Sequence, residues 1–348
     1  MNASSYVSQL DALHLELLHA AIPQQYDTIG VMMPGVAGRI GCRASAYRSA
    51  AKRLCRSGAE NVESLLAAFL SDAQCRRTQG RGYVQEVLWT VMLAASQAEG
   101  IPFAKRLEWL DKLAQCVDNW ASCDLLGEAV KDFTLAQNEA SAFAFMDALI
   151  KSRNLWRIRL ALVLMLAHMA PAGSRPLERA VQLSSAPEVL TCAAQSYYGS
   201  MGLAWAFSVY AVHDFSLVER VVVDLIVNKR IDPATARRTA QKVRESFRSA
   251  QAEKALLSQN IQKALDGIPA GSLPAARNNK PAGAVPAFRR KLLKGTPPST
   301  AVEPIGRLDF VLKRVFTTQT KENKRCVNSF KNFKPLFLRA MCWTLLWP

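Results

Sequence analysis

The chain has 348 residues, half of them apolar, with a mean hydropathy near zero and a net charge of +16. This length allows one or two domains with a sizeable core; no apolar run approaches the roughly 20 residues of a transmembrane helix, and the N-terminus lacks the basic and apolar regions of a secretion signal. Eight cysteines without CxxC spacing and only four histidines argue against a disulfide framework and a zinc site, and favour a reducing cytoplasm.

The positive charge is concentrated towards the C-terminal end. From Gly271 onward, fifteen Lys and Arg stand against three Asp and Glu, so this stretch carries +12 and the rest of the chain about +4. Half of the sixteen prolines also fall there. The net charge therefore describes a tail and says little about the partners of the folded part.

The first amphipathic stretch runs over residues 5–21, with leucines at helical spacing. Residues 23–41 contain two prolines and several glycines, which predicts a loop. Helical periodicity then returns in twelve stretches, at about 43–57, 60–72, 83–98, 103–116, 118–136, 139–152, 154–170, 174–184, 187–212, 215–228, 233–248 and 250–265.

The breaks between these stretches are short, and none of the stretches shows strand alternation. Asp232 before Pro233 is a typical helix start, with a capping side chain followed by proline at the first helical position. The apolar run 160–170 carries His168, and we interpret it as a buried helix. About a dozen helices joined by tight turns predict an all-α fold of stacked helical pairs, an α-solenoid.

The predicted domain organisation is a helical-repeat domain over residues 1–265 and a basic, Pro-rich, largely disordered tail over residues 266–348. Residues 306–316 have the pattern of a short basic amphipathic helix within that tail.

Trp120 and Asp124 are four residues apart and so lie on the same helical face. An aromatic face beside a carboxylate suits an electron-poor sugar or base. The alternative is a core tryptophan with Asp124 acting as a cap or an ion-pair partner, and spacing alone leaves both interpretations open.

Arg159 stands within an otherwise apolar helix and follows Trp156 and Arg157. A buried arginine is costly unless it is paired, so we expect it to face either a carboxylate or a phosphate.

Trp205 follows two tyrosines in a helix rich in small residues, where it is either core filling or part of a surface. The basic helix 237–248 is either a solvated face or a phosphate contact.

Several motifs are missing: there is no P-loop, GxGxxG, HExxH, GxSxG or Cys/His cluster. Nucleotide hydrolysis and metal-dependent hydrolysis are therefore disfavoured. The four dispersed histidines are interpreted as structural.

The order DNWxxxD, an Arg in an apolar helix, YYxxMxxAW and QKxRES resembles the AlkD-like DNA alkylation repair glycosylases. The resemblance runs over residues 118–124, 156–167, 197–205 and 241–246. A weaker match begins at Gly41-Cys42-Arg43, and overall coverage is about residues 30–255.

The resemblance implies HEAT-like repeats that grip duplex DNA containing alkylated bases, in a monomer with no cofactor, metal or membrane, located in the cytoplasm and on the nucleoid when bound to DNA. It places the catalytic role on Asp124, Trp120 and Trp205. It places DNA binding on five basic residues: Arg159, Arg157, Lys242, Arg244 and Arg43.

The implied reaction removes N3- or N7-alkylated purines, which are cationic and already good leaving groups. A carboxylate stabilises the oxocarbenium-like sugar, indole faces add cation–π attraction, and no general acid is needed. Two alternatives stay open: a non-catalytic helical-repeat module that binds DNA, and a scaffold for a protein partner. The region before Gly41 does not match the family clearly, and the sequence indicates no role for Cys123.

Overall fold

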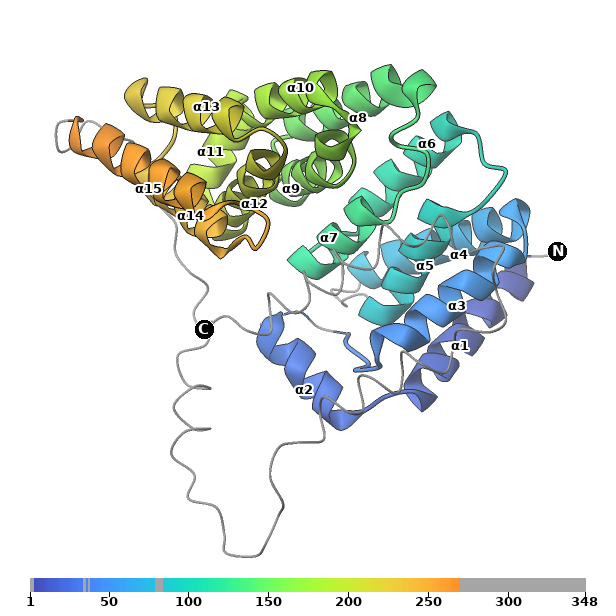
Figure 1. Cartoon of the computed structure of the whole chain (residues 1–348). Helices are drawn as coiled ribbons and strands as arrows, with labels where there is room; N and C mark the ends of the chain where they lie inside the picture. The colour runs from blue at the N-terminus through green and yellow to red at the C-terminus, as the bar shows by residue number, and fades with distance from the viewer. Residues whose placement is uncertain (1–2, 34–35, 37, 79–83, 269–348) are drawn as a thin grey trace, which may run out of the picture. The chain divides into compact units, whose positions relative to one another are not determined.

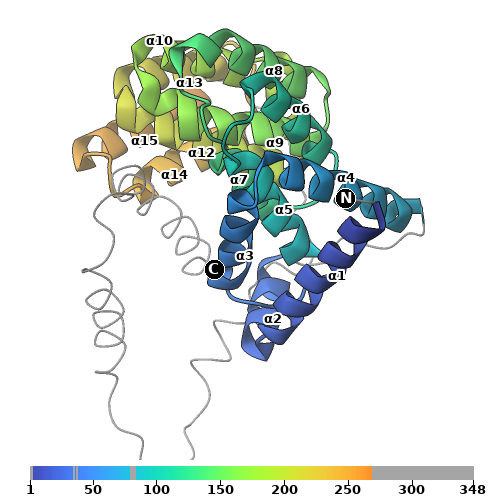
Figure 2. The ribbon, with the colours of Figure 1, turned by 90° about the vertical axis from the view of Figure 1, so that its right-hand side faces the viewer.

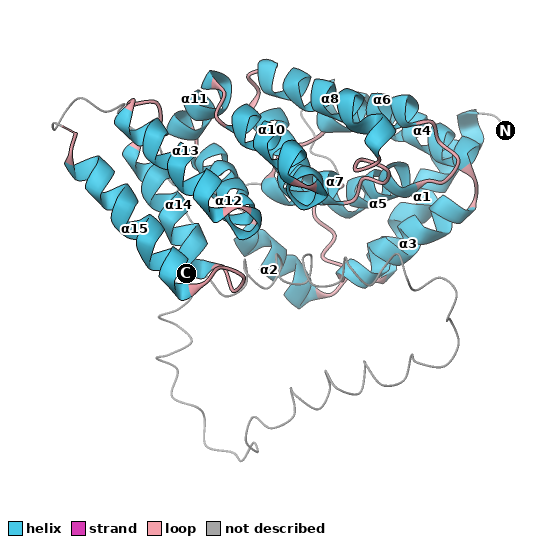
Figure 3. Ribbon diagram, turned by 45° about the horizontal axis from the view of Figure 1, so that its top comes forward, coloured by secondary structure: helices cyan, strands magenta, loops and turns pink. Residues whose placement is uncertain are grey.

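A computed structural model describes residues 3–33, 36, 38–78 and 84–268, and within these ranges all repetitive secondary structure is helical (Figure 3). This confirms the predicted all-α class. The only strand-like pairing in the described ranges is an isolated antiparallel bridge between Ala21 and Cys42. The elements are α1 (Ala3–His19), α2 (Pro23–Met32), α3 (Ala44–Arg56), α4 (Ala59–Thr78), α5 (Gln85–Gln97), α6 (Phe103–Ala114), α7 (Trp120–Glu128), η1 (Ala136–Asn138), α8 (Glu139–Lys151), α9 (Leu155–Leu164), η2 (Met165–Met169), η3 (Ala170–Ala172), α10 (Ser174–Ser184), α11 (Pro187–Gln195), α12 (Tyr197–His213), α13 (Phe215–Val227), α14 (Pro233–Glu245) and α15 (Gln251–Asp266).

The helices stack in two rows. The helices α3, α5, α7, α9, α12 and α14 form one row in which each packs against the next. The helices α6, α8, α10 and α13 lie along one side of this row (Figures 1 and 2), and each packs on a member of it. Consecutive helical pairs packed in this way make the α-solenoid that the helix lengths and turns predicted.

Helices in the first row are covered by other helices on most sides, and long stretches of them are buried. In α5 every residue from Gln85 to Ser96 is buried, and in α9 every residue from Ile158 to Leu164 is buried. Among the described residues, one segment, Leu155–Ala172, has the length and apolar composition needed to cross a membrane. However, 67% of this segment is buried inside the fold. That burial agrees with the interpretation of residues 160–170 as a core helix.

The prediction of a loop over residues 23–41 is wrong for its first part, because Pro23–Met32 is α2. Pro23 occupies the first helical position, where its missing N–H costs nothing. The predicted helix 187–212 is also wrong as a single element. It is divided at Ser196, whose extended backbone and side chain form the N-cap of α12, with the hydroxyl accepting a hydrogen bond from the Gly199 N–H.

Close approach of α7 to α9 depends on a glycine. A Cβ added to Gly127 would lie 2.6 Å from Val163 Cγ1, so any larger residue would push the two helices apart. The Gly127 carbonyl also accepts a hydrogen bond from His168 Nε2 at 2.8 Å, from the π-turn η2 that follows α9. Burial lowers the pKa of His168 to about 4, so this histidine is neutral and structural.

The last described helix, α15, ends at Asp266. The described residues all belong to one compact unit. Residues 269–348, to which the disordered tail and the short helix at 306–316 were assigned, lie outside the described residues.

Candidate active site

The start of α7 is fixed by a side-chain cap. Asn119 precedes the helix with an extended backbone, and its Oδ1 accepts a hydrogen bond from the Ser122 N–H at 3.0 Å. Trp120 is therefore the first helical residue, held where the chain enters the helix. Its side chain is half-buried, so it is neither a fully enclosed core residue nor a fully exposed one.

A buried polar network ties this cap to α5. Asn119 Nδ2 and Ser122 Oγ both donate to Gln85 Oε1 at 3.0 Å, and Trp89 Nε1 donates to Ser122 Oγ at 2.9 Å. The four side chains are buried, so each bond forms in a low-dielectric setting where its loss would leave a costly unpaired group. The network thereby fixes the position of Trp120 relative to α5.

Asp124, one turn after Trp120, forms a bidentate ion pair with Arg159 of α9. Arg159 Nε lies 2.9 Å from Asp124 Oδ1, and Arg159 Nη2 lies 2.8 Å from Asp124 Oδ2. The side chains are 7% and 16% exposed for Arg159 and Asp124, so the pair is largely withdrawn from water while the carboxylate keeps the larger share of contact with it. The expectation that the buried arginine would face a carboxylate or a phosphate is met by the carboxylate.

The electrostatics of this pair reflect opposing effects. Burial raises the pKa of Asp124 above its usual value, and the Arg159 guanidinium opposes that rise. Burial acts to lower the pKa of Arg159, but the Asp124 carboxylate outweighs this and the arginine pKa is raised. Two parallel charge-assisted hydrogen bonds are the strongest form of this contact, so the structure holds Asp124 as a carboxylate at neutral pH.

Arg159 also joins α12 to the pair. Its Nη1 donates to the backbone oxygen of Tyr198 at 3.0 Å. A Cβ placed on Gly202 would lie 3.5 Å from Arg159 Cγ, so this side of α12 faces the arginine. Trp205, half-buried and three residues beyond Gly202, lies on the same helical face. The structure thus brings Asp124 and Arg159 into direct contact, with Trp120 on α7, the helix that carries Asp124, and Trp205 on α12, which packs on the helix that carries Arg159.

Cys123, for which the sequence indicated no role, packs between the two helices that carry the ion pair. Its side chain is completely buried, and its Sγ lies 3.5 Å from the Trp156 carbonyl oxygen of α9. Burial raises the thiol pKa well above its ordinary value, so the sulfur is a neutral packing group.

An aromatic row that sequence reasoning did not assign continues from this site. The rings of Trp156 and Tyr198 have centroids 5.2 Å apart, and those of Tyr198 and Tyr197 are 5.6 Å apart. The Arg238 guanidinium of α14 lies 5.1 Å from the Tyr197 ring centroid. These four residues are half-buried. The signal in the sequence was the adjacent tyrosine pair, but nothing in the sequence placed Trp156 beside it.

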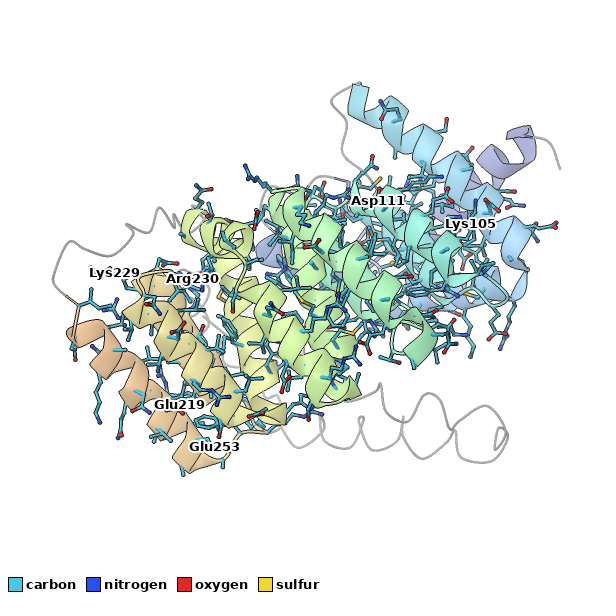
Figure 4. All side chains as sticks on the ribbon, turned by 90° about the horizontal axis from the view of Figure 1, so that it is seen from above. Lys105, Asp111, Glu219, Lys229, Arg230 and Glu253 are labelled. Carbon is cyan, nitrogen blue, oxygen red and sulfur yellow. The ribbon has the colours of Figure 1, made fainter. Side chains whose placement is uncertain are left out.

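The other predicted DNA-binding residues occupy separate positions. Arg157 is half-buried and pairs with Asp111 of α6, which Figure 4 labels. Lys242 pairs with Glu245 at 3.0 Å. The two remaining residues are exposed: Arg244 donates to Ser258 Oγ at 3.0 Å, and Arg43 stands at the N-cap position of α3. Their role in DNA binding stays a prediction.

Glu128 is a further titratable group near the pair, and sequence reasoning missed it. It lies four residues after Asp124 and ends α7. Burial first, and then the Asp124 charge, raise the pKa of its carboxyl to about 8, against the lowering effect of Arg48 of α3. The spacing of four, repeated from Trp120 through Asp124 to Glu128, was the available signal. Within the described ranges no three His, Cys, Asp or Glu side chains are grouped as a metal site would require.

The fold and the ion pair define the class of protein. The molecule is an α-solenoid in which a largely buried carboxylate–guanidinium pair joins successive helices of one row, with a half-buried tryptophan on α7 and another on α12. The sequence profile of the family described as "DNA alkylation repair enzyme" matches residues 14–243, which is 230 of the 348 residues. The chain therefore belongs to this DNA alkylation repair family, as its motifs indicated. No curated protein and no solved structure gives a significant match to the chain.

Proposed function

We propose that this protein is a DNA glycosylase that excises cationic N3- or N7-alkylated purines from duplex DNA. Family membership supports DNA alkylation repair as the process and DNA as the partner. The observation that supports this specific activity is the Asp124 carboxylate, which two hydrogen bonds from Arg159 hold in one orientation, one helical turn from Trp120.

The chemistry follows from the charge on each group. An alkylated purine leaves with the electron pair of the glycosidic bond, and the sugar becomes oxocarbenium-like. A fixed carboxylate next to that sugar stabilises the positive charge as it develops and orients the attacking water. The faces of Trp120 and Trp205 would each add roughly 0.5–2 kcal/mol of cation–π attraction to the charged lesion.

Arg159 contributes in this proposal through Asp124 and through the DNA backbone. Its guanidinium has five N–H donors, of which three are used on Asp124 and the Tyr198 carbonyl. In this proposal the other two donate to a phosphate oxygen at the small exposed part of the side chain, and the bidentate contact keeps the carboxylate in one orientation.

The test is release of 7-methylguanine from a duplex oligonucleotide by the full chain, comparing wild type with Asp124→Asn. We expect the rate to fall about 100- to 1,000-fold, the usual loss when one charge-stabilising group is removed from an active site. Asp147→Asn is the matched control, because Asp147 lies on α8 and pairs with Lys151 at the surface at 2.6 Å. It should keep the wild-type rate.

A folded Asp124→Asn protein that releases the base at the wild-type rate would refute the catalytic assignment. One observation favours a second candidate, a DNA-binding module without excision: both oxygens of Asp124 already accept hydrogen bonds from Arg159. That function predicts salt-dependent binding to duplexes and no release of base by the wild type.

A further inference from the structure

Glu128 is an ionisable side chain near Asp124, and the reaction proposed above does not use it. Trp120, Asp124 and Glu128 follow one another at intervals of four residues, so they lie along one face of α7. One helical turn separates the Asp124 and Glu128 positions by about 6 Å along the axis. The side chain of Glu128 is half-buried, and the charges of Asp124 and Arg48 both act on its carboxyl.

The charged groups around Glu128 come from three elements. Asp124 lies on its own helix and Arg48 on α3, and these are the two charges that act on the Glu128 carboxyl. Arg159 of α9 is committed to Asp124. Three titratable groups on elements packed against α7 have partners of their own: Glu86 accepts from the Ile40 and Gly41 amides, Asp111 pairs with Arg157, and His168 bonds the Gly127 carbonyl.

Asp124 and Glu128 are therefore two carboxyls in contrasting settings. Arg159 holds Asp124 as a carboxylate. At Glu128, burial and the neighbouring Asp124 carboxylate outweigh the opposing charge of Arg48, so a pKa of about 8 leaves this carboxyl mostly protonated at neutral pH. A neighbouring pair with one carboxyl ionised and the other protonated is the arrangement that assigns base and acid roles in many hydrolases.

We propose that Glu128 is a general acid that protonates an uncharged purine as it leaves, so that the site also excises neutral alkylated purines. This inference rests on the proposed glycosylase function and extends its substrate class. A cationic lesion leaves without help, whereas a neutral base must gain a proton at a ring nitrogen.

The glycosidic C–N bond breaks with its electron pair going to the purine, and the Glu128 carboxyl delivers its proton to that purine nitrogen. Asp124 stabilises the resulting oxocarbenium-like sugar. Water then forms the new C–O bond, and the proton it loses returns to the Glu128 carboxylate, so no oxidant or cofactor is required.

The experiment compares two duplex oligonucleotides, one with 7-methylguanine and one with the uncharged lesion ethenoadenine, using the full chain. We expect wild type to release both bases. Glu128→Gln preserves size but carries no transferable proton, and it should lower the ratio of ethenoadenine release to 7-methylguanine release about 100-fold, the lower end of general acid catalysis. Glu178→Gln, at an exposed position on α10, is the matched control and should keep the wild-type ratio.

Three results separate the inference from the proposed function. If wild type releases 7-methylguanine but no ethenoadenine, or if Glu128→Gln lowers both rates equally, the general-acid role is refuted and the glycosylase function stands. If wild type releases neither base, the glycosylase function itself fails. Glu128→Asp keeps an acid and should recover part of the ratio.

Two pH measurements test this role: the pH profile of base release, which a structural role would not produce, and the pH dependence of melting, which tests whether the folded chain holds Glu128 protonated. Ethenoadenine release by wild type should fall as the pH passes about 8, while 7-methylguanine release should show no matching fall. Because the folded-state pKa of Glu128 is above its unfolded value of 4.5, the unfolded chain loses this proton first. The melting temperature of wild type should therefore decrease relative to Glu128→Gln between pH 4.5 and about 8. Parallel melting curves would overturn the inference.

Discussion

Two buried arginines in the same solenoid are held in opposite ways. Arg106 of α6 is 1% exposed and donates to the carbonyls that end α5, with Nη1 2.8 Å from Ser96 O and Nη2 2.8 Å from Ala98 O. Arg159 of α9 is 6% exposed and donates chiefly to a carboxylate. Burial is thus nearly equal, and the acceptors differ.

The difference shows in the pKa of each side chain. Burial lowers the pKa of Arg106, and the half-exposed Asp132 carboxylate offsets this effect only partly. The pKa of Arg159 is raised because the Asp124 carboxylate more than offsets burial. A buried arginine therefore marks a candidate site when its partner is another buried charge, and marks a structural clamp when its partners are helix-end carbonyls.

The largest effect should follow from Arg159→Met. Removing one partner leaves the Asp124 carboxylate largely buried without its counter-charge, and breaking such a pair costs about 3–5 kcal/mol of unfolding free energy. Urea unfolding measures this loss. The double variant with Asp124→Asn should recover part of it, because the uncompensated charge is then gone; a double variant less stable than Arg159→Met would contradict the pairing account.

Arg106→Met should have a smaller effect, about 2–3 kcal/mol, because three carbonyl acceptors lose a donor but no opposite charge is left buried. The acceptors are those of Ala95, Ser96 and Ala98. The same urea titration measures the loss, and 7-methylguanine release per folded molecule should match wild type. A selective loss of release would show that Arg106 belongs to the site and would remove the contrast between the two arginines.

Asp132→Asn should have the smallest effect, below about 1 kcal/mol, as for most exposed ion pairs. Asp132 lies 3.6 Å from Arg106 Nη2 and its side chain is 46% exposed, so water screens the contact. Its backbone φ of 61° is in the left-handed region, which asparagine tolerates as well as aspartate does. A melting temperature several degrees below wild type would show that Arg106 depends on this carboxylate after all.

Much of the fold follows from the sequence because helix periodicity and caps are local properties. The apolar spacing predicted most of the helices within a few residues, and Asp232 with Pro233 starts α14 as expected, with Asp232 Oδ1 accepting from the Thr235 N–H at 3.0 Å. The prediction failed where punctuation was ambiguous. Pro23 begins α2 instead of excluding a helix, and Ser196 ends one helix and caps another.

For the candidate site, the sequence by itself determined which residues share a helical face and that Arg159 needed a charged partner. It also carried the order of motifs that indicated the family, which the profile match over residues 14–243 confirms. The roles of Asp124, Trp120, Trp205 and the basic residues are still predictions, to be decided by base release and DNA binding.

Only the tertiary structure decided which groups meet across helices. The contact of Asp124 with Arg159 joins residues 35 apart, the Arg159–Tyr198 contact joins residues 39 apart, and the Gln85–Ser122 bond joins residues 37 apart. The pKa of Glu128 likewise depends on tertiary structure, because burial raises it most, Asp124 of the same helix raises it further, and Arg48 of α3 lowers it. The spacing of residues along the chain determines which side chains share a helical face. The burial and ion pairing of those side chains depend on the residues of the neighbouring helix, and these are determined by how the whole row of helices packs.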